Sequence, residues 1–352
     1  MNLPVSVCIP TYNGEKYLAE CLDSICAQTF ADFEVLVVDD CSTDTTLEIA
    51  GEYAARDSRI RILQNERNLG LVGNWNRCVE LARGEWIKFV FQDDLIAPTC
   101  LERMVGAAQP DSSLVFCWRD FIFEESTPDS TRDAYLAGKS LVERLFPDRR
   151  PVTARQFSER VLDNMERNLI GEPSAVMLHR RVFQQFGGFN PHLIVSCDTE
   201  YWMRVGIHEG VVPVPVALAS FRVHGGSVSA QSLARREYRT NVLDGLAMWH
   251  EIVFNPVYEP LRRVATERGI DLARQFKDKA LWAYGLAKRA EQDEKTPDGS
   301  LLREWEDVAA HFRGISMVPF RYAALRLGSR FQARYRSLLG LGRGQNRDAE
   351  KR

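Results

Sequence analysis

The sequence predicts an α/β fold built on a mostly parallel β-sheet, and two patterns carry that prediction. Short runs rich in β-branched and aromatic residues, bounded by turn residues, are typical of strands. Between these runs the apolar residues recur at helical spacing on one face of each segment. Because strand, helix and strand alternate through the first 118 residues, we expect right-handed crossovers and a parallel sheet flanked by helices.

The expected elements follow one another in regular order. The predicted strands are residues 5–9, 34–38, 60–63, 86–91 and 114–117. The predicted helices are residues 15–28, 43–56, 71–82, 99–108 and 154–168, with another beginning near Asp198. The stretch from 120 to 170 is otherwise polar and irregular, and residues 171–224 hold short apolar runs and glycine turns.

We predict one α/β domain and a helical extension. The domain covers residues 1–230, with a first half to about residue 118 and a second half from about residue 119. Residues 231–352 form the predicted helical C-terminal extension. Its last part, residues 313–352, carries ten Lys or Arg against two acidic residues, a net charge of +8. Apolar residues interleave with these arginines, so the tail can lie on an anionic membrane surface or pack as an ordinary helix.

The composition predicts a cytosolic globular protein. Its 45 basic and 48 acidic residues give a net charge of −3, which does not indicate a nucleic-acid partner. No apolar run approaches the roughly 18 residues of a membrane span, and a strand-like run follows Met1, so we expect neither a span nor a signal peptide. The eight cysteines form no Cys-x-x-Cys pair and are expected to be free thiols in a reducing compartment.

Polar loops follow the predicted strands, and ligands of parallel sheets bind beyond the carboxyl ends of the strands. The loop after residue 91 begins Gln92, Asp93, Asp94. Repulsion between adjacent carboxylates is commonly relieved by a divalent cation, although Asp94 could instead cap the next helix. The loop after residue 38 holds Asp39 and Asp40, and a buried Asp40 carboxylate would accept a ligand N–H strongly.

Several enzyme classes lose support because their motifs are missing. No Gly-x-Gly-x-x-Gly follows a strand, which argues against a nicotinamide or flavin dehydrogenase. No Gly-x4-Gly-Lys-Ser/Thr loop, His-Glu-x-x-His helix or Gly-x-Ser-x-Gly elbow occurs either.

Taken together, the motifs of residues 3–225 resemble the glycosyltransferase family 2 domain. The segments that carry the resemblance, in the family's order and spacing, are Val5–Gly14, Leu18–Phe30, Phe33–Asp44, Asn65–Gly70, Ala82–Ile87 and Gln92–Asp94. The resemblance implies the GT-A fold, a Rossmann-like sheet that binds a nucleotide-activated sugar.

The resemblance also implies roles on the donor side. Tyr12 is implied to pack on the nucleotide base, Asp40 to accept from the base N–H, and Asp93 to take the sugar or ribose. Asp94 is implied to bind the metal that bridges the diphosphate. Many relatives carry Asp-x-Asp-Asp here, and because Phe91 replaces the first acid the metal role rests on Asp94. The implied nucleotide-sugar contacts are Pro10, Thr11, Tyr12, Asn13, Glu15, Asp40, Asn68, Gly70, Gln92 and Asp93.

The segments Phe186–Asn190 and Cys197–Arg204 resemble the acceptor side of the family. They imply that Asp198 is the catalytic base, at a position where relatives carry Glu-Asp and this chain carries Cys197-Asp198. An acid at a helix start can also serve as a cap. Trp202 and Arg204, one turn further on, are implied to shape the acceptor pocket, although a Trp at this spacing also fits a core.

His224 resembles a family position from which a His reaches the metal or diphosphate, and a lone His can equally be an ordinary surface or core residue. Residues 225–229, rich in Gly and Ser, could order over a bound nucleotide as a lid.

The expected protein is a metal-dependent inverting glycosyltransferase that uses Mn²⁺ or Mg²⁺. It is expected to move a sugar from a nucleoside diphosphate, UDP first with dTDP open, to a hydroxyl of a saccharide or lipid-linked saccharide, as in surface polysaccharide synthesis. The expected location is cytoplasmic, with possible peripheral contact to the membrane through the basic tail. The alternative is a non-catalytic nucleotide-sugar or saccharide-binding protein on the same fold, because Phe91 and Cys197 replace acids. A nucleotidyltransferase is disfavoured, because no Gly-rich triphosphate loop follows the first strand.

Overall fold

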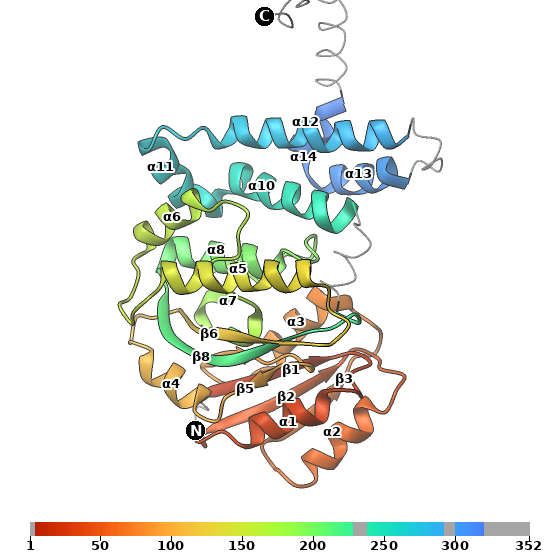
Figure 1. Ribbon diagram of the computed structural model, residues 1–352, viewed down its shortest axis with the longest axis vertical. Helices are drawn as coiled ribbons and strands as arrows, with labels where there is room; N and C mark the ends of the chain where they lie inside the picture. Colours follow the sequence, from red (N-terminus) through yellow and green to blue (C-terminus); the bar gives the residue numbers. More distant parts are fainter. Residues whose placement is uncertain (1–3, 228–237, 292–299, 320–352) are drawn as a thin grey trace, which may run out of the picture. The chain divides into compact units, whose positions relative to one another are not determined.

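The computed structural model describes residues 4–227, 238–291 and 300–319, and within them it confirms the predicted α/β sheet (Figure 1). The strands are β1 (Val5–Thr11), β2 (Phe33–Asp39), β3 (Ile60–Gln64), β4 (Trp86–Phe89), β5 (Leu95–Ile96), β6 (Leu114–Phe123), β7 (Val176–His179) and β8 (Val212–Val223). They lie in the order β3-β2-β1-β4-β7-β6-β8-β5. Only β7 and β5 pair antiparallel with their neighbours among these strands, so the sheet is mostly parallel, as predicted.

The helices cover both faces of this sheet. The first compact unit contains α1 (Leu18–Cys26), α2 (Thr46–Ala54), α3 (Gly70–Leu81), α4 (Cys100–Ala107), α5 (Asp129–Leu145), α6 (Ala154–Asp163), α7 (Arg181–Phe186), α8 (Cys197–Glu209), α10 (Asp244–Phe254) and α11 (Glu259–Glu267). Figure 1 shows α1 and α2 on the near face of the sheet and α3 on the far face. Right-handed crossovers produce this arrangement, because the chain runs from β1 outward to β3 and then returns to β4.

Burial on both faces explains why the central strands are continuous apolar runs. All seven residues of β2 are buried, and β1 is buried except for Pro10. The core cluster joins these strands to Leu18, Leu22 and Ile25 of α1. All eight cysteines are free, as predicted, and six of them are buried.

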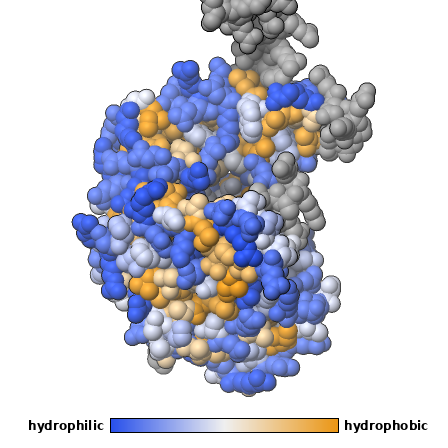
Figure 2. Space-filling view, in the orientation of Figure 1, coloured by the Kyte–Doolittle hydropathy of each residue, from blue (hydrophilic) through white to orange (hydrophobic). Residues whose placement is uncertain are grey.

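Helix α5 is the largest element that the sequence did not predict. Its 17 residues have a low mean hydropathy, and only Val142 among them is buried. Leu136 on the same helix is 45% exposed. Figure 2 shows apolar patches on the face of the molecule that is in view, on a surface that is otherwise largely hydrophilic. The low mean hydropathy of this segment explains why the sequence suggested a polar, irregular stretch, although its apolar residues recur at helical spacing.

The chain divides into two compact units, residues 1–272 and 273–352. The first unit contains α10 and α11, which lie past residue 230. The described helices that follow are α12 (Leu272–Ala290), α13 (Ser300–His311) and α14 (Arg313–Ser316). No described helix is both long and apolar enough to span a bilayer. Most of the predicted amphipathic tail, from residue 320 on, lies outside the described residues.

The close contact of β1 and β4 leads to a stability prediction. Gly84, just before β4, donates its N–H to Ser6 Oγ at 2.7 Å, and a Cβ on Gly84 would lie 2.4 Å from the Ser6 backbone nitrogen. We expect Gly84→Ala to lower the free energy of unfolding by about 1–3 kcal/mol, because the two strands would have to separate. Urea denaturation measures this change.

The matched control is Gly106→Ala in α4, where no atom lies within 4 Å of the added Cβ. We expect the stability of this variant to be unchanged or raised by up to about 1 kcal/mol. Equal losses in the two variants would contradict the steric explanation.

Candidate functional site

A cleft of about 820 Å³ opens at the carboxyl edge of the sheet. Loops that follow β1, β2, β3, β4, β6 and β8 line this cleft, because these strands all end at that edge. The segments before β7 and at the start of α8 complete the lining. The predicted site residues that line the cleft are Pro10, Thr11, Tyr12, Asn13, Asp40, Asn68, Gly70, Gln92, Asp93, Asp198 and His224. The structure therefore brings together residues from three distant parts of the sequence.

Gln92 fixes the loop that presents Tyr12. Gln92 Oε1 accepts the Tyr12 N–H at 3.0 Å, and Gln92 Nε2 donates to the Tyr12 carbonyl at 3.1 Å. The Tyr12 side chain remains 50% exposed at the cleft. Asn13, in the left-handed region with φ 47°, accepts the Thr43 N–H at 2.9 Å and so joins the loops after β1 and β2.

Asp40 is already hydrogen-bonded within the protein. The carboxylate is 2% exposed and accepts the N–H groups of Leu69 at 2.8 Å and Gly70 at 2.9 Å. It also accepts from Asn65 Nδ2 at 2.8 Å. Since these bonds hold the start of α3, Asp40 keeps Asn68 and Gly70 at the cleft.

Asp93 and Asp94 face opposite ways. Asp94 has no exposed surface, accepts from Ser174 Oγ at 2.5 Å and the Arg222 N–H at 2.9 Å, and is not among the described residues that line the cleft. Burial, reinforced by the charge of Asp93, raises the pKa of Asp94 well above its usual range. The structure thus places Asp94, for which a metal role was expected, beneath the cleft surface and not on its lining. Asp93 lines the cleft instead, and its Oδ2 lies 2.9 Å from His224 Nε2.

Residues just before α1 and just after β6, which sequence reasoning missed, lie near the His224 ring. The Tyr17 ring packs 4.8 Å from it, between centroids. Glu124, after β6, accepts from the Tyr17 hydroxyl and from Lys16 Nζ, the latter at 2.6 Å. The sequence around these polar residues gives no local indication of a site, because segments distant in sequence bring them together. Residues 228 and 229 of the predicted lid lie outside the described residues.

Asp198 stands on the opposite wall of the cleft, as the second residue of α8. Its carboxylate accepts the Thr199 N–H at 2.5 Å and Asn168 Nδ2 at 3.3 Å. Burial raises the pKa of Asp198 to about 7, with a further contribution from the charge of Glu172 and opposition from the Thr199 bonds. A carboxylate with such a pKa can accept a proton near neutral pH.

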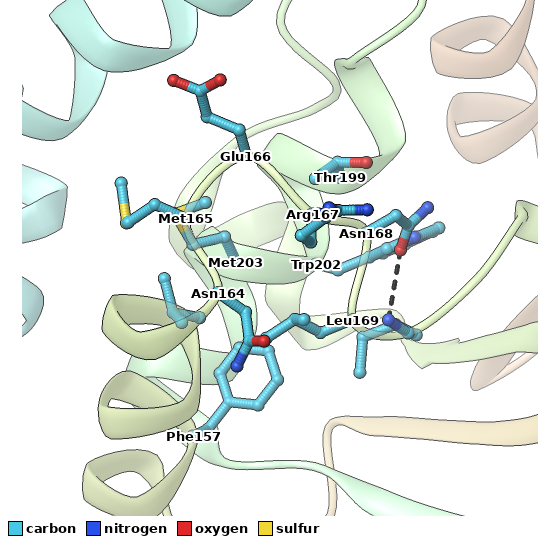
Figure 3. Close-up of a pocket in the computed structure, with 12 residues that line it drawn as sticks. Phe157, Asn164, Met165, Glu166, Arg167, Asn168, Leu169, Thr199, Trp202 and Met203 are labelled. Atoms are coloured by element: carbon cyan, nitrogen blue, oxygen red, sulfur yellow. Dashed lines mark hydrogen bonds between the residues drawn. The ribbon is translucent and has the colours of Figure 1, made fainter. Parts of the chain in front are cut away.

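The loop before β7 supports this wall. Asn168 Oδ1 accepts the N–H groups of Ile170 at 3.1 Å and Gly171 at 2.8 Å, and Figure 3 marks a bond from Asn168. Glu172 lines the cleft and forms an ion pair with the buried guanidinium of Arg119. The sequence predicted neither Glu172 nor Arg119, because only the fold places this pair beside Asp198.

Trp202 and Arg204, which were expected to shape the acceptor pocket, are not among the described residues that line the cleft. Trp202, labelled in Figure 3, is 1% exposed, and its Nε1 donates to the Gly171 carbonyl at 2.9 Å. Arg204 is 8% exposed and binds both oxygens of Glu200, at 3.0 and 2.6 Å. Both side chains therefore stabilise α8 through buried contacts. Glu15 also lies away from the cleft lining and accepts the Thr45 N–H at 3.1 Å.

An α/β sheet with an acidic cleft at its carboxyl edge defines a ligand-binding protein of the doubly wound class. Residues 6–186 match the family model described as glycosyl transferase family 2, and the chain therefore belongs to this family.

Known proteins similar to this chain agree with that membership. The uncharacterized protein MT1568 of Mycobacterium tuberculosis is 32% identical over 256 residues, which are 72% of this chain and 76% of the relative. Six further curated relatives carry glycosyltransferase names, and the chain spans between 30% and 63% of the length of each.

Two solved structures share the fold. The S. aureus TarS 1–349 complex with UDP aligns with a TM-score of 0.51 and 20% identity, over 92% of each chain. The mannosyltransferase PcManGT from Pyrobaculum calidifontis, in complex with GDP-Man and Mn²⁺, aligns with a TM-score of 0.55 and 18% identity. This alignment covers 93% of this chain and 87% of PcManGT. At these identities the likeness shows the fold alone.

The buried ion pair of α8 leads to a second prediction. We expect Arg204→Ala to lower the free energy of unfolding by about 3–5 kcal/mol, because it leaves the buried Glu200 carboxylate unpaired. Arg77→Ala is the control, since Arg77 and Glu80 form an exposed pair at 2.8 Å worth about 0–1 kcal/mol. Thermal denaturation compares them. An Arg204→Ala protein as stable as the control would contradict the supporting role.

Proposed function

We propose that this protein is an inverting glycosyltransferase that transfers a sugar from a nucleoside diphosphate donor to a hydroxyl of a saccharide or lipid-linked saccharide. The observation that carries the proposal is Asp198, whose pKa is raised to about 7 in the same cleft as Tyr12 and the Asp93–His224 pair. Membership in glycosyl transferase family 2 supports it.

UDP-sugars are the proposed donors. The exposed ring of Tyr12 offers a stacking surface for the base, and Asp40 lines the same cleft. The UDP bound in the TarS complex supports this choice. Because PcManGT is solved in complex with GDP-Man, a binding screen should compare GDP-sugars with UDP-sugars.

Asp198 acts as the base in this proposal. A sugar hydroxyl is a poor nucleophile, and a carboxylate within hydrogen-bond reach takes its proton as the new glycosidic bond forms. Asn168 and Thr199 orient the Asp198 carboxylate through the bonds described above. Attack from the side opposite the leaving diphosphate, with a single base, inverts the anomeric centre.

Asp93 and His224 are the residues proposed to hold a divalent cation, Mn²⁺ or Mg²⁺. Within the described residues no group of three or more His, Cys, Asp or Glu could hold a metal ion. A carboxylate and an imidazole 2.9 Å apart on the cleft nevertheless fit the usual arrangement, in which substrate phosphates and water complete the ligands. The bound cation would neutralise charge on the leaving diphosphate.

The pKa of Asp198 predicts how transfer depends on pH. Below pH 7 its carboxyl group is protonated and cannot accept a proton, so we expect kcat/KM to fall by about tenfold per pH unit on the acidic side. Above pH 7 the rate should reach a plateau. A pH profile of UDP release from a UDP-sugar measures this.

Asp198→Asn should lower the rate of transfer by about 10²- to 10⁴-fold. It should retain UDP binding, which calorimetry measures. A binding protein without activity would show no turnover in the wild type, and that result would overturn the proposed function.

The opposite orientations of Asp93 and Asp94 predict opposite effects on metal binding. Asp93→Ala should weaken Mn²⁺-dependent UDP binding by about tenfold or more, because it removes a ligand from the cleft. Asp94→Asn should leave that binding within about threefold, since an amide can keep both the Arg222 and Ser174 hydrogen bonds. Titration calorimetry with and without Mn²⁺ tests both. A larger loss for Asp94→Asn than for Asp93→Ala would refute the assignment.

A further inference from the structure

The loop that leads into α8 is held by a carboxylate from a distant part of the chain. Ser196 occupies the capping position of α8, but its side chain makes no capping hydrogen bond. The backbone N–H groups of Ile194, Val195 and Ser196 donate instead to Asp244 Oδ2, at 2.8, 2.7 and 3.1 Å. One carboxylate thus binds three successive backbone donors at the start of the helix that carries Asp198.

Asp244 is suited to a permanent role of this kind. It is the first residue of α10 and has no exposed surface. Arg239 Nη1 donates to Asp244 Oδ1 at 2.6 Å, and Arg239 Nη2 donates to the His192 carbonyl at 2.6 Å. A buried carboxylate is costly unless it is paired and hydrogen-bonded, and Asp244 has both kinds of partner.

The helix that carries Asp244 is itself anchored beside the site. Trp249 Nε1 of α10 donates to Glu166 Oε1 at 2.6 Å, next to the loop that contains Asn168. Further along, the hydroxyl of Tyr258 donates to Glu200 of α8. Asp244 is therefore fixed relative to α8 by contacts other than its own.

The geometry assigns Asp244 as a positioning residue for transfer. It binds the loop that leads into α8 and so holds two parts of the acceptor wall, the cleft-lining pair Ile194 and Val195 and, through this loop, the base Asp198. This inference rests on the proposed function. Asp244 lies after β8 and beyond residues 6–186, which match the family model. A segment outside the matched residues therefore helps to build the acceptor side of the site.

Donor binding should not depend on this contact. The residues proposed to hold the nucleotide and cation come from the loops after β1, β2, β3, β4 and β8. In the bonds described above, Asp244 contacts only the loop before α8 and its own neighbour Arg239. Loss of Asp244 should separate transfer from binding.

The experiment compares Asp244→Ala and Asp244→Asn in the full chain. The control is Asp163→Asn, which neutralises an exposed Asp–Arg pair, 2.6 Å from Arg268 and away from the cleft. Three quantities are measured: amide hydrogen exchange of residues 194–199, UDP affinity by calorimetry, and turnover of a UDP-sugar with added saccharide acceptors.

In Asp244→Ala we expect protection at residues 194–196 to fall by about tenfold or more, because three backbone donors lose their acceptor. Turnover should fall by about tenfold to a hundredfold, since the base is no longer held in place. UDP affinity should stay within about twofold. Asp244→Asn, which keeps one acceptor oxygen, should be intermediate and decides the question if the Ala variant does not fold. The control should match the wild type.

Unchanged protection at residues 194–196 would overturn the role of Asp244 in holding the loop, and lost protection with normal turnover would overturn its positioning role. UDP affinity that falls in parallel with turnover would show general damage and would also overturn the positioning role. A wild-type protein that turns over no nucleotide-sugar would refute the proposed function, while the exchange measurement would still report on the contact between Asp244 and the loop.

Discussion

Hydrogen bonds from backbone N–H groups to buried carboxylates hold the loops of this cleft in place. Asp40 binds the start of α3, Asp94 binds the backbone at Arg222, and Asp244 binds the loop before α8. An ionised carboxylate is a stronger hydrogen-bond acceptor than a neutral group. Such bonds therefore hold each loop in place. The acids that face the cleft, Asp93 and Asp198, are supported by this set of buried acids.

The two walls of the cleft differ in how they are built. The donor wall consists of loops that directly follow parallel strands, so the sheet itself sets their positions. The acceptor wall depends on contacts between helices and loops, such as the Trp202 bond to Gly171 and the Arg204 pair with Glu200. Desolvation at this second wall raises the pKa of Asp198, whereas the donor wall places Asp93 beside an imidazole. One cleft thus holds a carboxyl group with a raised pKa and, separately, an Asp–His pair.

The sequence was informative where periodicity was strong and motifs were local. Strands β1, β2 and β4 are short, regular and deeply buried, and most of the predicted nucleotide-sugar contacts follow such strands directly. Strand β5 has two residues and α5 has a low mean hydropathy, so neither stood out in the sequence. Trp202 and Arg204 lie inside the protein because α8 is buried nearly all round, and its spacing does not mark one face. Glu172, Arg119 and Asp244 become visible only through contacts between distant segments.

The contact between Gln92 and Tyr12 bears on how specificity could diverge among similar proteins. Gln92 binds only the main-chain N–H and carbonyl of Tyr12, so the anchor is independent of which side chain stands at position 12. The side chain at position 12 can therefore change while the loop keeps its conformation. Gln92 itself has less freedom, because Glu has no N–H donor and Asn is one methylene group shorter. The side chain presented to the cleft and the conformation of its loop are thus encoded at separate positions, and one can change without the other.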